Sequence, residues 1–444
     1  MAERSDESPL EGVKRRVLWQ EQAPPLPDRS GRPLPDAVDV VVVGGGYTGI
    51  AAARQLARQG ATVTLVEAER MGFGASTRNG GIVHPGYKLG AAELIRRFGE
   101  ETAAALYLET LQACDLVKSL IADEGMNAEL VSGGHLELAY APSHAEAFEA
   151  EGAAIERLGG RANVIPPDRL GEEVGSDVYF GGLAIEGGGG IHPARYFGGL
   201  VDAAERAGAD LHEGVRAHAL RRQADGRSVV ETNRGAIFSR DVFVATNGYT
   251  NGFVPALRRR LIPIGSYIIA TEPLPDELAR SLSPKGRVFF DTKNFLYYWR
   301  VTADNRLAFG GRASFIPTSV DRTARILLRG MLDVYPQLSG VRIEYAWGGN
   351  VGFTFDRMPH VGRLGGVTYA IGYCGSGIAL ATYLGTKAAE WLGGGQPPAL
   401  AQLPFPLVPA PYEGRPWFLP FAGEWYRLQD RIAARSRRQP ALKH

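Results

Sequence analysis

The feature that most constrains the fold is a cluster of glycines between an apolar run and an alanine-rich run. Residues 38–43 are almost all valine, which is typical of a strand buried on both faces of a parallel sheet. The glycines that follow have GxGxxG spacing: Gly44, Gly46 and Gly49. Residues 47–59 predict a helix and residues 61–67 predict a second strand, so the segment predicts a βαβ unit of about 30 residues.

Each part of this unit suits a phosphate-bearing dinucleotide. Gly44 allows a tight turn, Gly46 lets the backbone approach a pyrophosphate, and Gly49 lets helix and strand pack closely. The helix N-terminus supplies free N–H groups and a partial positive charge for that anion. Glu67 ends the second strand, where its carboxylate can accept hydrogen bonds from a ribose diol. The sequence therefore predicts a dinucleotide site.

Length and composition are those of a globular protein. The chain has 444 residues, which allows two or three domains of roughly 150 residues. Apolar residues make up 45% and charged residues 22%, and the formal charge of +1 gives no reason to expect nucleic acid as a partner. Cys114 and Cys374 lie far apart, and no histidines have metal-ligand spacing, so neither a disulfide framework nor a metal site is predicted.

No targeting or membrane segment is expected either. The first 36 residues are polar and rich in proline, without the apolar core of a secretory signal. No run of about 18 apolar residues is present, so no transmembrane segment is predicted. A cytoplasmic location follows as the default expectation, whereas the oligomeric state stays open.

The segment after Glu67 decides between FAD and NAD. Residues 72–87 read GFGASTRNGGIVHPGY, which offers polar donors beside two glycines that permit close backbone approach. This run resembles the D-amino-acid oxidase superfamily, and specifically its glycine-oxidase-like and gamma-glutamylputrescine-oxidoreductase-like flavoproteins, which carry a similar GAS-x-RNGG run. The resemblance implies FAD as the cofactor, with this segment beside the pyrophosphate and the flavin ring.

Later segments extend the resemblance from about residue 38 to residue 432. Residues 242–250 read VFVATNGYT, and residues 347–378 read WGGNVGFTFDRMPHVGRLGGVTYAIGYCGSGI, which is similar to the closing FAD-binding run of the family. The tail PWFLPFAGEWYRLQDRIA resembles the same group. Together the motif and the resemblance predict these FAD contacts: Gly44, Gly46, Tyr47, Thr48, Gly49, Glu67, Ala68, Arg70, Ala75, Ser76, Arg78, Asn79, Gly80, Gly81, Val215, Ala245, Thr246, Asn247, Gly248, Gly349, Gly372, Tyr373, Gly375, Gly377 and Ile378.

The resemblance also implies the fold class. An α/β fold of the glutathione-reductase type is expected, in which a Rossmann domain for FAD is interleaved with an α+β substrate domain built on a mixed sheet. The expected division is an extended arm at 1–36, an FAD-binding domain at 37–90, 185–260 and 345–395, a substrate-binding domain at 91–184 and 261–344, and a C-terminal tail at 396–444. The basic run from Arg427 to Arg438 predicts a solvated helix face, with docking to a partner or an anionic surface as the alternative.

Only one dinucleotide fingerprint is found, whereas reductases fed by NAD(P)H usually have a second one in mid-chain. We therefore expect FAD-dependent oxidation of a C–N bond in an amine or amino acid, with O2 as the electron acceptor. Three alternatives stay open: an amine dehydrogenase that passes electrons to a quinone or protein, an NAD(P)H-dependent monooxygenase or reductase, and a noncatalytic FAD-bound module.

The resemblance implies that arginine and tyrosine side chains of the substrate domain bind a carboxylate. The expected substrate residues are Tyr87, Tyr297, Tyr298, Arg300 and Arg312, and the expected catalytic residues are His84, Tyr298 and Arg300. His84 has a structural role or a covalent flavin link as alternatives. Some relatives attach flavin through a cysteine near the position of Gly349, where this chain has none, so noncovalent FAD is expected. Arg306 is expected where some oxidases place an oxygen-activating lysine.

Overall fold

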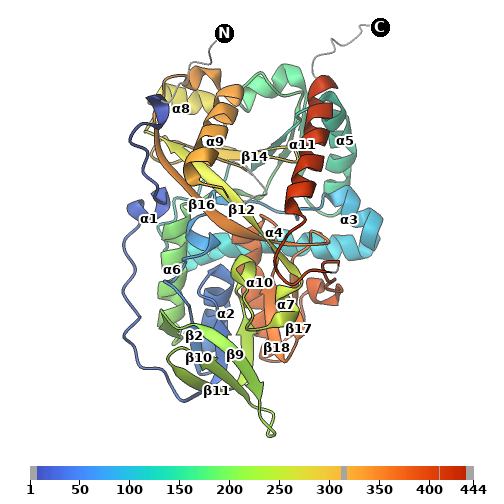
Figure 1. Cartoon of the computed structure of the whole chain (residues 1–444). Coiled ribbons are helices and arrows are strands. Elements are labelled where there is room, and N and C mark those ends of the chain that lie inside the picture. The colour runs from blue at the N-terminus through green and yellow to red at the C-terminus, as the bar shows by residue number, and fades with distance from the viewer. Residues whose placement is uncertain (1–7, 312–317, 410, 437–444) are drawn as a thin grey trace.

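A computed structural model describes residues 8–311, 318–409 and 411–436, which form two large sheets with helices around them (Figure 1). The first sheet has a parallel centre with antiparallel strands at one side. Its order is β17 (His360–Leu364), β18 (Val367–Ile371), β11 (Gly235–Val244), β1 (Ala37–Val43), β2 (Val63–Val66) and β8 (Asp210–His212). A β-meander of β9 (Ala217–Arg222) and β10 (Ser228–Thr232) joins this sheet at β11.

Strand β1 is buried on both faces, as the run of valines predicts. Val40 and Val42 face one hydrophobic core, while Val41 and Val43 face another, because successive side chains of a strand point to opposite faces. The first core is covered by α2 (Tyr47–Arg58), α4 (Glu100–Asp123), α6 (Pro193–Arg206) and α10 (Gly377–Leu392). Because α2 begins directly after β1 and packs in this core, the glycine turn between them is held at the edge of the sheet.

The second sheet is mixed and joins segments that lie far apart in the sequence. Its order is β16 (Ile343–Thr354), β12 (Leu261–Thr271), β15 (Leu307–Gly311), β14 (Tyr297–Val301), β13 (Val288–Asp291), β4 (His135–Leu138), β6 (Gly182–Ile185) and β5 (Ala162–Ile165). One face packs against α8 (Asp276–Leu282) and α9 (Val320–Val334) around Trp299, which stacks on Phe289 and Phe309. Part of the opposite face packs against Leu18 and Trp19 of the N-terminal arm, and another part lines a cavity.

The remaining elements connect or cover these layers. The helices are α1 (Leu18–Gln22), α3 (Ala91–Phe98), α5 (Pro142–Arg157), α7 (Pro255–Arg258) and α11 (Leu419–Ser436). A short ribbon pairs β3 (Ile82–Val83) with β7 (Gly189–Gly190). Short 3-10 helices in the described part of the chain lie at Ser8–Leu10, Ala75–Thr77, Pro167–Glu172, Asn247–Tyr249, Pro336–Leu338 and Ala399–Gln402.

The predicted α/β class with one mixed sheet is confirmed, and two details differ from the expectation. Strand β16 keeps residues up to Thr354 in the second sheet, although 345–395 was assigned to the FAD-binding domain. The arm at 1–36 is not simply extended, because it contains α1, whose Leu18 and Trp19 are buried.

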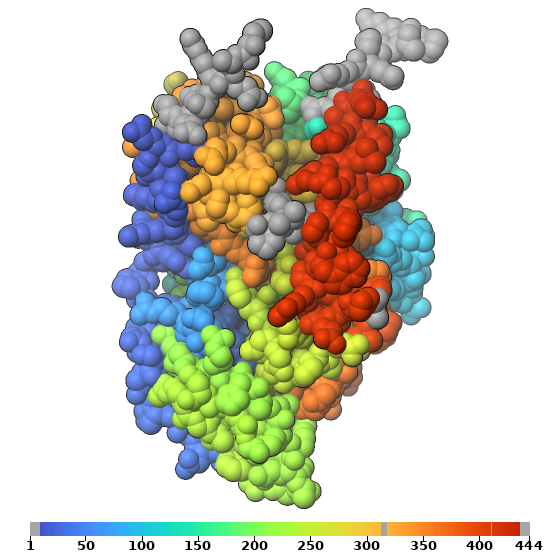
Figure 2. All heavy atoms as spheres, in the orientation of Figure 1, coloured from blue at the N-terminus to red at the C-terminus, as the bar shows by residue number. Residues whose placement is uncertain are grey.

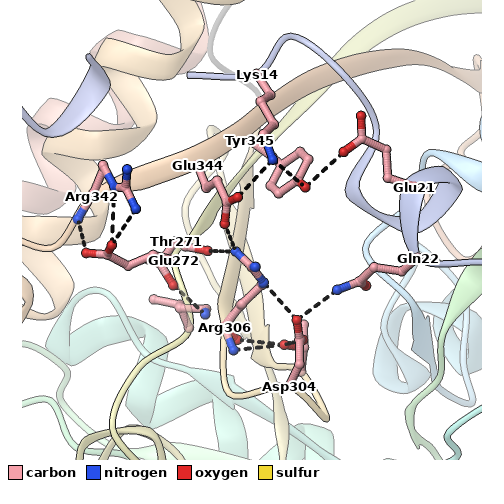
Figure 3. A network of polar contacts seen from close by, with 12 residues as sticks. Lys14, Glu21, Gln22, Thr271, Glu272, Asp304, Arg306, Arg342, Glu344 and Tyr345 are labelled. Carbon is pink, nitrogen blue, oxygen red and sulfur yellow. Dashed lines mark hydrogen bonds and ion pairs between the residues drawn. The ribbon is translucent and has the colours of Figure 1, made fainter. Parts of the chain in front are cut away.

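Polar contacts also fasten the arm to the second sheet (Figure 3). Arg306 donates a hydrogen bond of 2.7 Å to Asp304 and pairs with Glu344. Lys14 of the arm donates to Glu344 at 2.9 Å, and Gln22 donates to Asp304 at 2.7 Å. Arg306 therefore bridges the arm to the sheet, and its equivalence to the oxygen-activating lysine of some oxidases stays a prediction.

The C-terminal segment forms a surface helix, α11, on the face shown in Figure 2. Asp430 anchors its inner side by accepting hydrogen bonds from the backbone N–H groups of Asn294 and Phe295. Its outer side carries exposed apolar side chains: Phe421, Trp425, Leu428 and Ile432. The basic run predicted as a solvated helix thus also carries an apolar stripe. Within the described residues, no helix has the length and hydropathy needed to cross a bilayer.

Candidate cofactor and active site

A cavity of about 920 Å³ lies between the two sheets. The first sheet contributes the ends of β1 and β2 and the segment after β11, which is the carboxyl edge where α/β proteins bind ligands. The second sheet contributes side chains from β4, β12, β13, β14 and β16. This volume lies near the upper end of the roughly 300–1,000 Å³ range of ligand pockets. One cavity can therefore hold a large ligand together with a small one.

The glycine turn has the geometry that its motif predicts. Gly44 has a φ of +113°, a backbone conformation that L side chains rarely adopt. A Cβ atom at Gly49 would lie 1.9 Å from the carbonyl oxygen of Gly44, so any larger residue would separate α2 from β1. A Cβ at Gly46 would lie 2.9 Å from the Ser76 hydroxyl. The glycines therefore bring the turn and the helix N-terminus up to the cavity.

Side chains around the turn complete this end of the cavity. Glu67 accepts a 2.7 Å hydrogen bond from the N–H of Gly45, and burial raises the pKa of its carboxyl group. Ser76 accepts a hydrogen bond of 3.0 Å from the N–H of Tyr47 at the start of α2. A carboxylate beside a glycine turn and a helix N-terminus is the donor and acceptor set that a dinucleotide needs.

The loop at residues 75–81 is braced from within by Asn79. Its side-chain amide donates to the carbonyl oxygens of Ala75 and Ser76 at 3.1 and 2.9 Å. Its side-chain oxygen accepts a 2.8 Å hydrogen bond from the N–H of Gly81, whose φ is +69°. The side chain of Asn79 thus links the beginning of the loop to its end by hydrogen bonds.

The same loop is held from behind by three large side chains. Trp347, Trp19 and Arg300 donate in turn to the carbonyl oxygens of residues 78, 79 and 80, at 2.9, 2.8 and 2.9 Å. A second guanidinium nitrogen of Arg300 donates to the carbonyl oxygen of Ile191 at 2.7 Å. None of the three donors lines the cavity, so these carbonyl groups face away from it.

Two segments predicted from the resemblance meet at the cavity. The side chain of Asn247, in the ATNG run, accepts a 2.9 Å hydrogen bond from the N–H of Gly372. The hydroxyl of Tyr373 lies 2.7 Å from that of Thr48 on α2. The closing segment is therefore tied to both the ATNG run and the first helix.

Most of the predicted FAD contacts line the cavity. The exceptions are Gly49, Arg70, Gly81, Gly248 and Gly372. The four glycines lie behind the lining: a Cβ on Gly81 would lie 2.2 Å from the Ile191 carbonyl oxygen, and one on Gly248 would lie 2.9 Å from a backbone nitrogen. Arg70 is exposed at the surface, so the structure gives no support for a contact between its side chain and FAD.

Tyr298 forms the part of the second sheet that touches the loop. A Cβ at Gly310 would lie 2.3 Å from its ring, and one at Gly80 would lie 3.0 Å from it, so both glycines make room for the ring. The Tyr298 hydroxyl lies 2.9 Å from that of Ser266. This tyrosine lines the cavity directly beside the loop, where a substrate contact was predicted.

His84 and Tyr87 also line the cavity, but both are engaged elsewhere. The His84 ring packs edge-on against His135 and Phe290, and its Nδ1 lies 3.0 Å from the Pro85 carbonyl oxygen. Burial lowers the pKa of His84 to about 4, so the ring is neutral at neutral pH. The Tyr87 hydroxyl donates to a backbone carbonyl oxygen at 2.7 Å.

Two other predicted substrate residues, Arg300 and Tyr297, do not line the cavity. Arg300 is 4% exposed and its guanidinium is used by the loop, so the predicted carboxylate contact does not match this arrangement. Tyr297 points to the opposite face of β14, where its ring lies against Gly330 and below Lys293, because neighbouring strand residues alternate. Arg312 lies outside the described residues.

Several lining residues were not predicted. Except for Tyr249, which lies in the run at 242–250, they come from segments without a recognised motif, and they include Lys88, Glu137, Tyr249, Ser266, Phe290 and Lys293. The pattern HLEL at 135–138 was a sequence signal for some of these residues. It places His135 and Glu137 on one face of a strand and two leucines on the other. Polar residues on one face of a short buried strand indicate a lined cavity.

Comparison with known proteins identifies the family. Residues 39–391 match the model of the FAD dependent oxidoreductase family. The chain belongs to this family. It is similar to gamma-glutamylputrescine oxidoreductase from Escherichia coli (strain K12), with 35% identity over 399 residues that cover 89% of this chain and 93% of that protein. It is also 26% identical to the sarcosine oxidase subunit beta of Rhizobium meliloti (strain 1021), over 81% of this chain and 85% of that subunit.

Solved structures agree with the fold of this FAD dependent oxidoreductase. The crystal structure of glycine oxidase from Geobacillus kaustophilus superimposes with a TM-score of 0.70 at 22% identity, covering 84% of this chain and 99% of that one. FAD is accordingly the cofactor, and the residues that line the cavity fit it. The Gly44 turn, the α2 N-terminus and Glu67 would hold the pyrophosphate and ribose, and the loop at 75–81 and Tyr373 would lie near the flavin.

Proposed function

We propose that this protein oxidises a C–N bond of an amine or amino acid and passes the electrons to O2. The names of its relatives, gamma-glutamylputrescine oxidoreductase and sarcosine oxidase subunit beta, support this class of substrate. In the overall reaction the amine, water and O2 become a carbonyl compound, a released amine or ammonia, and hydrogen peroxide. FAD, when bound, supplies the hydride acceptor for the substrate carbon next to nitrogen.

The observation that carries this proposal is the continuity of the cavity. Residues of the glycine turn and Tyr298 of the second sheet line the same space, so a substrate on the wall of the second sheet would lie against the cofactor. The Tyr298 ring, wedged between Gly80 and Gly310, has little freedom to move. A fixed aromatic wall can hold the reacting carbon in one orientation and keep water away from it.

Proton transfer does not require a strong side-chain base at His84. Its pKa of about 4 leaves it a neutral hydrogen-bonding group at neutral pH. A general base works best when its pKa lies near the working pH, so His84 is better suited to orientation than to proton abstraction. We propose that the substrate nitrogen reacts as the free amine, with its proton already lost to solvent.

We also propose that FAD is held without a covalent bond. Cys374 lines the cavity, but its sulfur lies 3.2 Å from the Gly372 carbonyl oxygen and 3.4 Å from the Thr354 hydroxyl. These contacts engage the thiol in the packing behind the closing segment.

Anaerobic reduction tests the proposal. The purified yellow protein is mixed, without oxygen, with primary and secondary amines in turn, and the visible absorbance of the flavin is followed. One amine should bleach the flavin, and air should restore the colour with release of hydrogen peroxide. Restoration by a quinone or dye but not by air would show an amine dehydrogenase. Bleaching by NADH or NADPH alone would overturn the proposal.

A further inference from the structure

Glu137 is a carboxylate inside the cavity that the reaction proposed above does not use. It lies on β4, opposite Phe290 of β13 and Leu183 of β6. Its strand neighbours Leu136 and Leu138 are fully buried in the core behind the second sheet, so Glu137 points the other way. Glu137 is half-buried: protein surrounds most of the residue, and the rest is open to the cavity that it lines.

Glu137 has no partner of its own. Its carboxylate forms no hydrogen bond and no ion pair with any residue in the part of the chain that the structure describes. A buried carboxylate is normally paired or hydrogen bonded, because removing its charge from water costs several kcal/mol. A ligand that fills the cavity displaces water from this half-buried carboxylate, so a cationic group on the ligand is needed to pair with it.

The charged residues around Glu137 also favour a cationic ligand group at this position. Glu151 of α5 lies near it, but that carboxylate already accepts hydrogen bonds from the N–H groups of Ala91 and Ala92, at 2.5 and 3.2 Å, at the start of α3. Burial, and then the negative charge of Glu151, raise the pKa of Glu137 to about 7, and Lys88 opposes the rise. An ammonium group beside Glu137 would remove this electrostatic penalty.

The position of Glu137 separates it from the reacting centre. Tyr298 on β14 touches the loop at residues 75–81, and β13 lies between β14 and β4. Adjacent strands are about 4.8 Å apart, so Glu137 stands about 10 Å along the sheet from Tyr298. A cation at Glu137 is thus several bonds away from a C–N bond held beside Tyr298.

We propose that Glu137 binds a second, unreactive ammonium group at the far end of the substrate. The substrate class is then a diamine, a polyamine or an aminoacyl diamine, with the oxidised C–N bond at one end and the bound cation at the other. This inference rests on the proposed amine oxidation.

The test compares substrates that differ only in the distal ammonium. One pair is putrescine and n-butylamine, and the other is gamma-glutamylputrescine and its glutaryl analogue, which lacks the α-amino group. The apparent KM and the limiting rate of anaerobic flavin bleaching are measured for the unchanged protein and for Glu137→Gln. Glu149→Gln removes a carboxylate from the exposed side of α5 and is the matched charge control. Bound FAD and circular dichroism verify that each variant is folded.

In the unchanged protein, the member of a pair with the distal ammonium should have the lower KM. Glu137→Gln should raise that KM about 10- to 100-fold, the loss expected for a hydrogen bond to a charged group. Glu137→Gln should leave the limiting rate nearly unchanged for both members of a pair. It should also leave nearly unchanged the KM of the member that lacks the distal ammonium. Glu137→Asp should recover part of the affinity for the other member.

Equal KM values within each pair, or an equal effect of Glu137→Gln on both members, would overturn the inference while leaving amine oxidation intact. A fall in the limiting rate for every substrate would instead show that Glu137 acts on the reacting nitrogen. If no amine bleaches the unchanged protein, the proposed function itself fails.

Discussion

Replacing Arg300 by methionine separates two roles for this residue, contact with a substrate carboxylate and support of the loop at residues 75–81. The guanidinium donates to the carbonyl oxygens of Gly80 and Ile191, and a methionine of similar length leaves both without a partner. Burial lowers the pKa of Arg300 to about 10, so the side chain is still charged at pH 7.

The expected loss follows from these two contacts. Each buried carbonyl left unsatisfied costs about 1–3 kcal/mol, so Arg300→Met should lower the free energy of unfolding by about 2–6 kcal/mol. Arg300→Lys should lose roughly half of that, because a single compact ammonium group can serve only one of the two oxygens well. Since Gly80 lines the cavity, the affinity of the apoprotein for FAD should also fall, by about tenfold or more for each 1.4 kcal/mol lost at the loop.

Urea unfolding measures the first quantity, and quenching of flavin fluorescence during titration of the apoprotein measures the second. Arg306→Met is the matched control, because Arg306 is also a buried arginine that donates to a carbonyl oxygen, at 2.8 Å, but it lies away from the cavity. This control should be destabilised with an unchanged affinity for FAD. The reasoning is refuted if Arg300→Met keeps its stability and FAD affinity but raises KM only for amines that carry a carboxylate.

Three further outcomes are expected. Gly49→Ala should abolish FAD binding, since its Cβ would lie 1.9 Å from a backbone oxygen, whereas Gly171→Ala, with open space around it, should bind FAD normally. Acid precipitation should release all the flavin into the supernatant, and yellow colour in the washed pellet would show a covalent bond. Burial lowers the pKa values of His84 and His192 to about 4, so the unfolded chain takes up protons first and the free energy of unfolding should fall as pH drops from about 6.5 towards 4. Urea unfolding at pH 7.5 and pH 5 measures this, and equal stability at both would contradict it.

The FAD-binding end of the cavity was largely predictable from the sequence. The glycine spacing, the valine run and Glu67 lie within a stretch of 30 residues, and their local geometry leaves few alternatives. The runs at 72–87, 242–250 and 347–378 could be assigned because their resemblance to a family is specific. The structure brings these segments together through contacts such as Asn247 to Gly372.

The substrate end of the cavity was much harder to predict from the sequence. The alternation of side chains along a strand places Tyr298 and Arg300 on one face of β14 and Tyr297 on the other, but it could not show what each face contacts. Tyr298 meets the cavity, whereas Arg300, two residues further along the same face, meets the back of a loop. Glu137 was missed because its strand pairs with β13, which lies more than a hundred residues further along the chain.

By itself, the sequence determined the dinucleotide turn and the helix that follows it, because glycine conformations, hydrophobic periodicity and helix ends are set by neighbouring residues. Only the tertiary structure decided which side chains line the substrate wall and which brace the loop behind it. Those roles depend on the pairing of β4, β13 and β14 and on the docking of the N-terminal arm. Such pairings are selected by the packing of the whole chain, and a local pattern specifies the face of a strand without specifying its neighbour.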